Sequence, residues 1–289
     1  MKSLAVRLWQ EGRFAQAASY QWVSYVAGAV LLLSGLFHFG VFLSDGGSWQ
    51  GPVSWRKPVV FGLSFGITVL TLTWLLTFFP IRKVTGWIVV SVLGIASLAE
   101  VYLISMQKWR GVASHFNEST AFDGMVFSAM GMLVMLIGLA SLYITVRSFF
   151  RLDAPPSLAW AIRTGLTLML VSQAIGVQMI AEGGNTFGAA GSMKLTHAIT
   201  LHAVQVLPAL ALLLGLSRFS ETSRIRIVLL GAIGYAGVFG ATAMQTYGGV
   251  SPLDIRVGPT VVALVGLVLL GASGLIAFGG LRSKVAGRA

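Results

Sequence analysis

The sequence contains eight long apolar segments separated by short polar connections, and this pattern restricts the fold more than any other feature. A helix needs about 20 mainly apolar residues to cross the hydrocarbon core of a bilayer. Charged residues make up only 10% of the chain, whereas a soluble domain carries about 25%. The segments lie near 22–43, 58–79, 86–106, 123–147, 158–180, 196–216, 227–247 and 259–280. We therefore expect an all-α integral membrane protein with eight transmembrane helices and no soluble domain.

The distribution of lysine and arginine predicts the orientation of these helices. If the N-terminus is cytoplasmic, 14 of the 20 basic residues lie on the cytoplasmic side, as the positive-inside rule requires. Eight spans return the C-terminus to that side. Topology thus accounts for the net charge of +11 without a nucleic-acid partner. We expect a multi-pass protein of the bacterial cytoplasmic (inner) membrane, with membrane lipid as its partner and its polar site facing the extracytoplasmic side.

Two short sequence echoes relate the halves of the chain. Residues 45–47 (DGG) recur as 182–184 (EGG) at an offset of 137, and residues 106–112 recur as 244–250 at an offset of 138. Each echo falls at an equivalent place, after the first helix or at the end of the third helix of its half. Chance matches of small residues are the alternative. Four spans in each half predict parallel repeats, related by an axis along the membrane normal.

This duplication defines the expected domain organisation. We expect one four-helix repeat over 22–150 and a second over 151–289. Residues 1–21 mix basic residues with leucine, tryptophan and phenylalanine, which is typical of a helix lying on the membrane surface. A frayed basic tail is the alternative interpretation of that segment.

Polar side chains inside the spans are the first functional candidates, because such groups are costly in a membrane. His197, His202 and Gln205 occupy the first three turns of span six, in the string KLTHAITLHAVQVLP, and Pro208 predicts a kink there. His38 lies near the outer end of span one. Each histidine either binds a ligand or forms a hydrogen bond to a neighbouring helix.

Acidic residues near the predicted outer side form a second group. Glu100 lies inside span three, where a carboxyl group is protonated, paired with a cation, or a ligand. Asp123 begins span four, where it is either a catalytic carboxylate or an N-cap. His115 lies in the connection before it, and is either part of a site or a solvated loop histidine. We treat Glu100 and Asp123 as the candidate catalytic residues.

A haem b or redox-metal site in the outer leaflet is the first functional hypothesis. His38 and His202 would be axial ligands, with Gln205 nearby. Arg56 and Lys57 would face the propionates, although both can equally reach lipid headgroups. Glu100 would handle protons, and the redox partner would be a quinol or an extracytoplasmic protein. Because the chain has no cysteine, thiolate ligands, iron–sulfur clusters and covalent c-type haem are excluded.

Two resemblances bear on this hypothesis. The strings GGSWQGPVSWRKP, SHFN and LHAVQVLP resemble those of uncharacterised bacterial polytopic membrane proteins, which implies the membrane fold but no activity. Eight spans in two four-helix bundles, with histidine and glutamate on the outer side, resemble the architecture of haem A synthase. In that family the histidines recur in both halves, whereas His38 here aligns with Ile175. The resemblance therefore transfers no catalytic residue.

Two other functions remain open from the sequence. Zinc held by three of the histidines His38, His115, His197 and His202 would support an intramembrane hydrolase acting on a lipid-like amide or ester. Copper is the alternative metal, since span four is rich in methionine. A transporter or small-ligand sensor is the third possibility, which parallel repeats favour. The sequence does not decide whether the protein is an enzyme.

Overall fold

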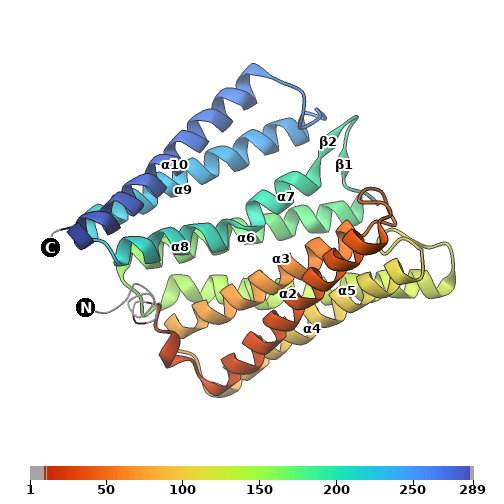
Figure 1. The fold of residues 1–289 in the computed structure, drawn as a ribbon, viewed down its shortest axis with the longest axis horizontal. Coiled ribbons are helices and arrows are strands. Elements are labelled where there is room, and N and C mark those ends of the chain that lie inside the picture. The colour runs from red at the N-terminus through yellow and green to blue at the C-terminus, as the bar shows by residue number, and fades with distance from the viewer. Residues whose placement is uncertain (1–9, 11, 287–289) are drawn as a thin grey trace. The chain divides into compact units, whose positions relative to one another are not determined.

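The structure is a computed structural model that describes residues 10 and 12–286 (Figure 1). Residues 1–9 and 11 of the expected interfacial segment at 1–21 therefore lie outside the described residues. The long helices are α2 (Ser19–Asp45), α3 (Arg56–Leu75), α4 (Lys83–Trp109), α5 (Ala121–Phe150), α6 (Pro156–Ala181), α7 (Met193–Leu201), α8 (Ala203–Gly215), α9 (Glu221–Tyr247) and α10 (Val257–Ala286). Short 3-10 turns, η1 (Phe14–Gln16) and η2 (Leu76–Phe78), precede α2 and extend α3.

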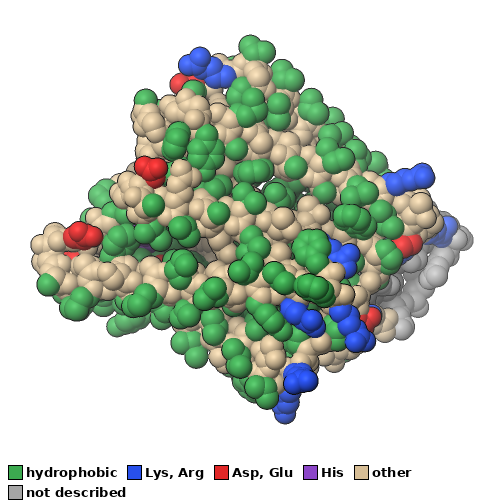
Figure 2. Space-filling model, turned by 180° about the vertical axis from the view of Figure 1, so that it is seen from behind, with side chains coloured by type: hydrophobic (Ala, Val, Ile, Leu, Met, Phe, Trp, Pro, Cys, Tyr) green, Lys and Arg blue, Asp and Glu red, His purple; other side chains and the backbone are tan. Residues whose placement is uncertain are grey.

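Among the described residues, eight helical stretches are long and apolar enough to cross a membrane, which confirms the predicted number of spans. Seven of them are formed by α2, by α3 with η2, and by α4, α5, α6, α9 and α10. The remaining span, Met193–Gly215, is made of α7 and α8 together. Figure 2 shows one face of the molecule, over which hydrophobic side chains are spread widely and charged side chains are few. Such an apolar exterior suits lipid as the surrounding solvent.

The described chain divides into two compact units. One unit is Ala17–Tyr143, and the other consists of the described residues of Met1–Gln16 and Ile144–Ala289. Helix α5 runs from the first unit into the second, because the division falls at residue 143. In the unit Ala17–Tyr143, α4 packs against both α2 and α3. Ile104, Val126 and Met130 form a buried cluster that joins α4 to α5.

Glycines let α2 and α3 approach closely. A Cβ atom placed on Gly62 would lie 2.7 Å from the backbone nitrogen of Gly35, and one on Gly35 would lie 2.9 Å from the backbone nitrogen of Leu63. These contacts are backbone atoms of the facing helix, so no side chain can rotate away. Such small-residue contacts provide tight packing where lipid and side chains are equally apolar.

Replacing Gly62 with alanine is therefore expected to destabilise the protein, because α2 and α3 must separate to admit the methyl group. We expect a loss of about 1–3 kcal/mol in the free energy of unfolding. Thermal unfolding of the purified protein in detergent measures this loss. Gly40→Ala on α2 is the matched control, since a Cβ there meets nothing within 4 Å. Equal stability of both variants would contradict the close contact.

The second unit contains an interruption and a hairpin that the sequence did not predict. Two short strands, β1 (Thr186–Phe187) and β2 (Gly191–Ser192), pair antiparallel between α6 and α7. The hairpin contacts the end of α9, where the Ala190 backbone nitrogen donates to the Gly249 carbonyl at 3.0 Å. A Cβ on Gly191 would lie 2.0 Å from the Thr246 carbonyl oxygen. Only glycine fits this close approach.

Span six is interrupted at His202, between α7 and α8. The interruption lies six residues before Pro208, whereas the sequence predicts a kink at the proline itself. The carbonyl that the ring of Pro208 displaces is that of Val204, four residues earlier, so the break at His202 lies outside the direct effect of the proline. The backbone nitrogens of Gln205 and Val206 both donate to the His202 carbonyl, at 3.1 and 3.2 Å. The Gln205 bond spans three residues, so the turn at His202 is tighter than an α-helical turn. Helix α8 then begins at Ala203.

The turns at the second sequence echo have matching backbone geometry, whereas those at the first share only a glycine with positive φ. Gly46 and Gly183 follow α2 and α6 with φ angles of 69° and 62°. Gly111 and Gly249 follow α4 and α9 with φ angles of 74° and 67°. In the latter pair of turns, the nitrogens of Val112 and Val250 bond the carbonyls of Gln107 and Gln245 at 3.1 and 3.0 Å.

Candidate functional site

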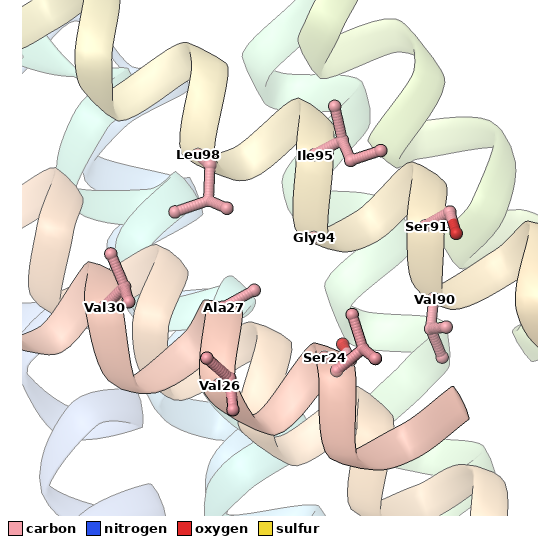
Figure 3. Close-up of a pocket in the computed structure, with 10 residues that line it drawn as sticks. Ser24, Val26, Ala27, Val30, Val90, Ser91, Gly94, Ile95 and Leu98 are labelled. Carbon is pink, nitrogen blue, oxygen red and sulfur yellow. The ribbon is translucent and has the colours of Figure 1, made fainter. Parts of the chain in front are cut away.

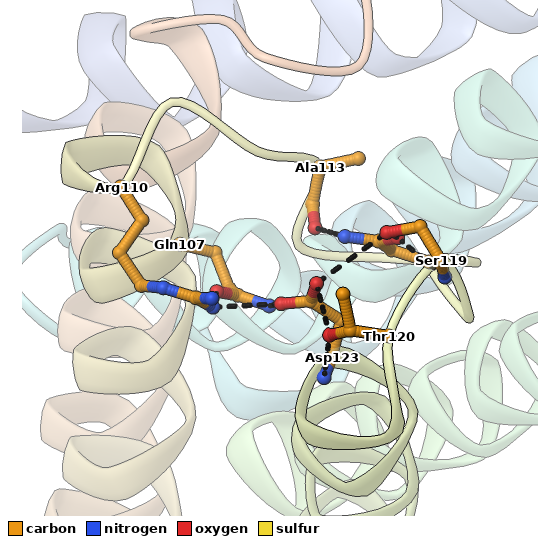
Figure 4. A network of polar contacts seen from close by, with 7 residues as sticks. Gln107, Arg110, Ala113, Ser119, Thr120 and Asp123 are labelled. Carbon is orange, nitrogen blue, oxygen red and sulfur yellow. Dashed lines mark hydrogen bonds and ion pairs between the residues drawn. The ribbon is translucent and has the colours of Figure 1, made fainter.

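Asp123 forms hydrogen bonds to residues of α4 and of the connection between α4 and α5 (Figure 4). Its Oδ1 accepts hydrogen bonds from Gln107 Nε2 at 2.9 Å and from Arg110 at 2.7 Å. Its Oδ2 accepts from Thr120 Oγ1 at 2.7 Å and more weakly from Ser119 Oγ at 3.4 Å. Asp123 is only 2% exposed. Both carboxylate oxygens are thus fully used by donors of this chain.

Thr120, rather than Asp123, caps α5. Helix α5 begins at Ala121, and the Thr120 hydroxyl oxygen accepts from the Asp123 backbone nitrogen at 3.1 Å. The Asp123 carboxylate in turn accepts from the same hydroxyl group. This reciprocal pair is a variant of the capping box. The predicted N-cap role of Asp123 therefore belongs to Thr120, and Asp123 lies three residues later, in the first turn of α5. A structural role fits Asp123 better than catalysis, because its lone pairs are occupied.

His115, Ser114 and Lys57 form a second cluster in the same unit. His115 Nδ1 lies 2.9 Å from Ser114 Oγ, and Lys57 Nζ lies 3.5 Å from that same oxygen. The imidazole ring packs against Phe61, with ring centroids 5.2 Å apart, and against Phe127 at 6.5 Å. A lysine ammonium group only donates, so the Ser114 hydroxyl donates onward to His115 Nδ1. His115 is therefore a neutral imidazole that carries its proton on Nε2.

Burial, together with the nearby positive charge of Lys57, lowers the pKa of His115 from its ordinary value of 6.5 to about 3. His115 stays neutral in the folded protein over the whole physiological range. In the unfolded chain it gains a proton below pH 6.5. The stability associated with His115 is therefore complete above pH 6.5 and is lost as the pH falls towards 3.

We expect wild-type protein to lose stability between pH 7 and pH 5, by about 2 kcal/mol from His115 alone. His115→Phe should lose less over the same interval, because a phenyl ring fits among the surrounding aromatic rings and does not titrate. Thermal unfolding of both proteins at the two pH values gives the difference. Parallel curves for the two proteins would show that His115 is solvated in the folded state.

His38 is held by hydrogen bonds at both ring nitrogens. Nδ1 lies 2.7 Å from the Ser34 carbonyl oxygen one turn earlier, and so carries the proton that it donates. Nε2 accepts from the indole N–H of Trp109 at 3.2 Å. Trp55 packs beside both rings, with centroids 6.1 Å from His38 and 5.0 Å from Trp109. The bond from Trp109 joins α4 to α2. His38 thus forms the hydrogen bond to a neighbouring helix that is the predicted alternative to ligand binding.

Glu100 lies on the buried face of α4 and is 1% exposed. Among the described residues, neither its Oε2 atom nor the Oγ atom of Ser97 has a hydrogen-bond partner. Ser97 is also 1% exposed and lies one turn before Glu100 on the same helix face. Two such buried polar atoms side by side call for a bound species that satisfies them, such as a proton, a water molecule or an ion.

The second unit holds the other predicted residues. His197 on α7 contacts α6, since its Nδ1 lies 2.8 Å from the Ser172 carbonyl oxygen. The Ser172 hydroxyl returns a bond of 2.8 Å to the His197 carbonyl. His202 Nδ1 lies 3.2 Å from Gln205 Oε1, directly at the interruption of span six. The two histidines therefore face different partners.

The predicted site residues fall into both units of the structure. His38, Arg56, Lys57, Glu100, His115 and Asp123 belong to one unit, and His197, His202 and Gln205 belong to the other. Arg56 and Lys57 begin α3, where Lys57 reaches Ser114. In the part of the chain that the structure describes, no group of three or more His, Cys, Asp or Glu residues is placed to hold a metal ion.

Three residues of these clusters were missed by sequence reasoning. Trp109, Ser114 and Ser172 have ordinary roles at an interface or in a turn, and only the fold brings each of them to a histidine. Trp109 does lie inside the echo at 106–112, opposite Tyr247 of the second half. Tyr247 also bonds the first helix of its half, donating to Gln178 Oε1 at 2.8 Å.

Comparison of the chain with protein-family models, with curated proteins and with solved structures found no match.

Proposed function

We propose that this multi-spanning membrane protein is a proton-coupled transporter, in which Glu100 carries the coupling proton. The observation that carries this proposal is the pair of buried, unpartnered atoms on α4, Glu100 Oε2 and Ser97 Oγ, within the described residues. An ionised carboxylate without a partner is strongly disfavoured inside a membrane. The neutral acid is the form that such a site accommodates. Loss of its proton then requires a conformation that admits water or a cation.

The interruption of span six supports the same class of function. Transporters use discontinuous helices, whose exposed backbone groups and polar side chains bind the solute within the membrane. Here His202 and Gln205 lie at the break between α7 and α8. We propose that these two side chains contact the transported solute.

Internal duplication also favours transport, since parallel repeats are common among transporters. The matching turns at Gly111 and Gly249 support this history. So does a close contact between the first two helices of each predicted repeat. A Cβ on Gly28 would lie 3.3 Å from the Gly66 carbonyl oxygen. One on Gly165, which is offset by 137, would lie 3.0 Å from the Ala203 carbonyl oxygen.

Infrared spectroscopy of the purified protein tests the proton on Glu100 without knowledge of the solute. A protonated carboxyl group has a carbonyl stretching band that a carboxylate lacks. We expect the wild type minus Glu100→Gln difference spectrum to contain this band at neutral pH. Asp123→Asn is the control, because Asp123 is bonded to Arg110 and should contribute a carboxylate signal instead. A carboxylate signal from Glu100 would overturn the proposal.

Haem b binding stays a prediction, and His38 as arranged here does not fit it. The Nε2 lone pair that would ligate iron accepts the Trp109 N–H group, and Nδ1 is bonded to the Ser34 carbonyl. Absorption spectra of oxidised and dithionite-reduced protein, expressed with ample haem, distinguish the cases. A featureless spectrum fits this arrangement. A Soret band lost in both His38→Ala and His202→Ala would establish haem and would require Trp109 to move.

A further inference from the structure

An apolar groove of about 260 Å³ runs between α2 and α4 (Figure 3). Ser24 and Ala27 on α2 and Ser91 and Gly94 on α4 make it hollow, because their side chains are small. Val26 and Ile95 stand at its rim and are 62% and 68% exposed. Both helices are long and apolar enough to cross a membrane, and in a bilayer the groove would open to the hydrocarbon region.

The length of the groove suits a lipid chain in one leaflet. Along α4 it extends from Val90 to Leu98, which corresponds to about 12 Å at the rise of an α-helix. One leaflet contributes roughly 15 Å of hydrocarbon. An acyl chain lying in the groove would therefore run nearly the whole depth of its leaflet.

The end of the groove near Val90 leads to a positively charged helix terminus. Arg82 and Lys83, both exposed, begin α4, and no side chain caps its first turn among the described residues. Lys83 precedes Val90 by seven residues, about 10 Å along the helix. Between them, Tyr20 and Trp87 form an edge-to-face pair with centroids 6.3 Å apart, as is typical of the membrane interface.

We propose that this groove is a binding site for an anionic glycerophospholipid, whose acyl chain lies between α2 and α4 and whose phosphate is bound by Arg82, Lys83 and the N-terminus of α4. The charge of the headgroup complements two basic side chains and the positive end of the helix dipole. Lipid tails are as apolar as the groove, so burial alone favours no particular lipid. The headgroup contacts therefore determine which lipid is retained.

Native mass spectrometry of the full-length protein, titrated with phosphatidylglycerol or phosphatidylcholine, tests this site. We expect one retained phosphatidylglycerol per chain and weaker retention of phosphatidylcholine. Arg82→Gln with Lys83→Gln should reduce the preference about fivefold for each charge removed. Both residues are exposed, so this variant should fold.

Gly94→Leu should reduce retention of both lipids about tenfold, because its side chain fills the groove. A Cβ at Gly94 meets only the Ala27 methyl group, at 3.4 Å. Gly40→Leu, placed where a Cβ meets nothing within 4 Å, is the control and should retain lipid. Equal binding of the two lipids by wild type, or unchanged binding by Gly94→Leu, would overturn the proposal. So would a wild-type dimer that dissociates in Gly94→Leu, because a second copy would then occupy the groove.

Discussion

Replacing Asp123 with alanine is expected to lower the unfolding temperature by roughly 5–12 °C. The substitution removes the acceptor shared by Gln107, Arg110 and Thr120. Gln107 is completely buried, so its amide cannot recover the lost bond from solvent. We expect a cost of about 2–4 kcal/mol, somewhat below that of a fully buried ion pair, because the Arg110 side chain is 38% exposed.

Thermal unfolding in detergent measures this loss, and two further variants identify its source. Arg110→Ala and the double variant complete a mutant cycle, in which a positive coupling energy isolates the ion pair. Asp254→Ala is the matched control, since in the described structure that exposed residue bonds through its backbone, whose nitrogen donates to Ser251 and whose carbonyl accepts from Gln245. If Asp123→Ala melted within about 1 °C of Asp254→Ala, the network would contribute little to the stability of the fold.

The eight spans could be predicted from the sequence because length and apolarity determine a membrane crossing locally. The observed helices begin and end within a few residues of the predicted ones. Breaks inside a span depend on a weaker signal. Pro208 indicates an irregular span six, but the break lies at His202, six residues before the proline.

Partners of the site residues could not be predicted, because they depend on side chains brought together from distant helices. His38 and Trp109 are 71 residues apart in sequence, and the bond between them exists only once α2 and α4 are packed. Asp123 was recognised as a polar residue at a helix start, but four donors on one carboxylate are a property of the folded loop. Glu100 was identified correctly as buried within its span, while the absence of a cationic partner for Oε2 in the described structure could be learned only from the fold.

Replacing Glu100 with glutamine is expected to abolish proton-coupled accumulation of solute while leaving the fold intact. Glutamine has nearly the same shape and remains neutral, so the buried site next to Ser97 keeps its packing. It cannot release a proton. Solute exchange needs no net proton movement and should therefore survive. Uptake driven by a pH gradient should fall at least about a hundredfold, because Glu100 is the only coupling group proposed.

Proteoliposomes loaded with a pH-sensitive dye provide the measurement, with amino acids, carboxylic acids, amines, sugars and short peptides supplied in turn. Ser97→Ala should weaken coupling partially, because the serine hydroxyl can stabilise the carboxylate when the proton leaves. Ser105→Ala is the matched control on the same helix, since its hydroxyl is buried and unpartnered among the described residues but lies on another face from Glu100. Proton movement unchanged in Glu100→Gln would remove Glu100 from the mechanism. Failure of every solute class to move protons in the wild type would contradict proton-coupled transport itself.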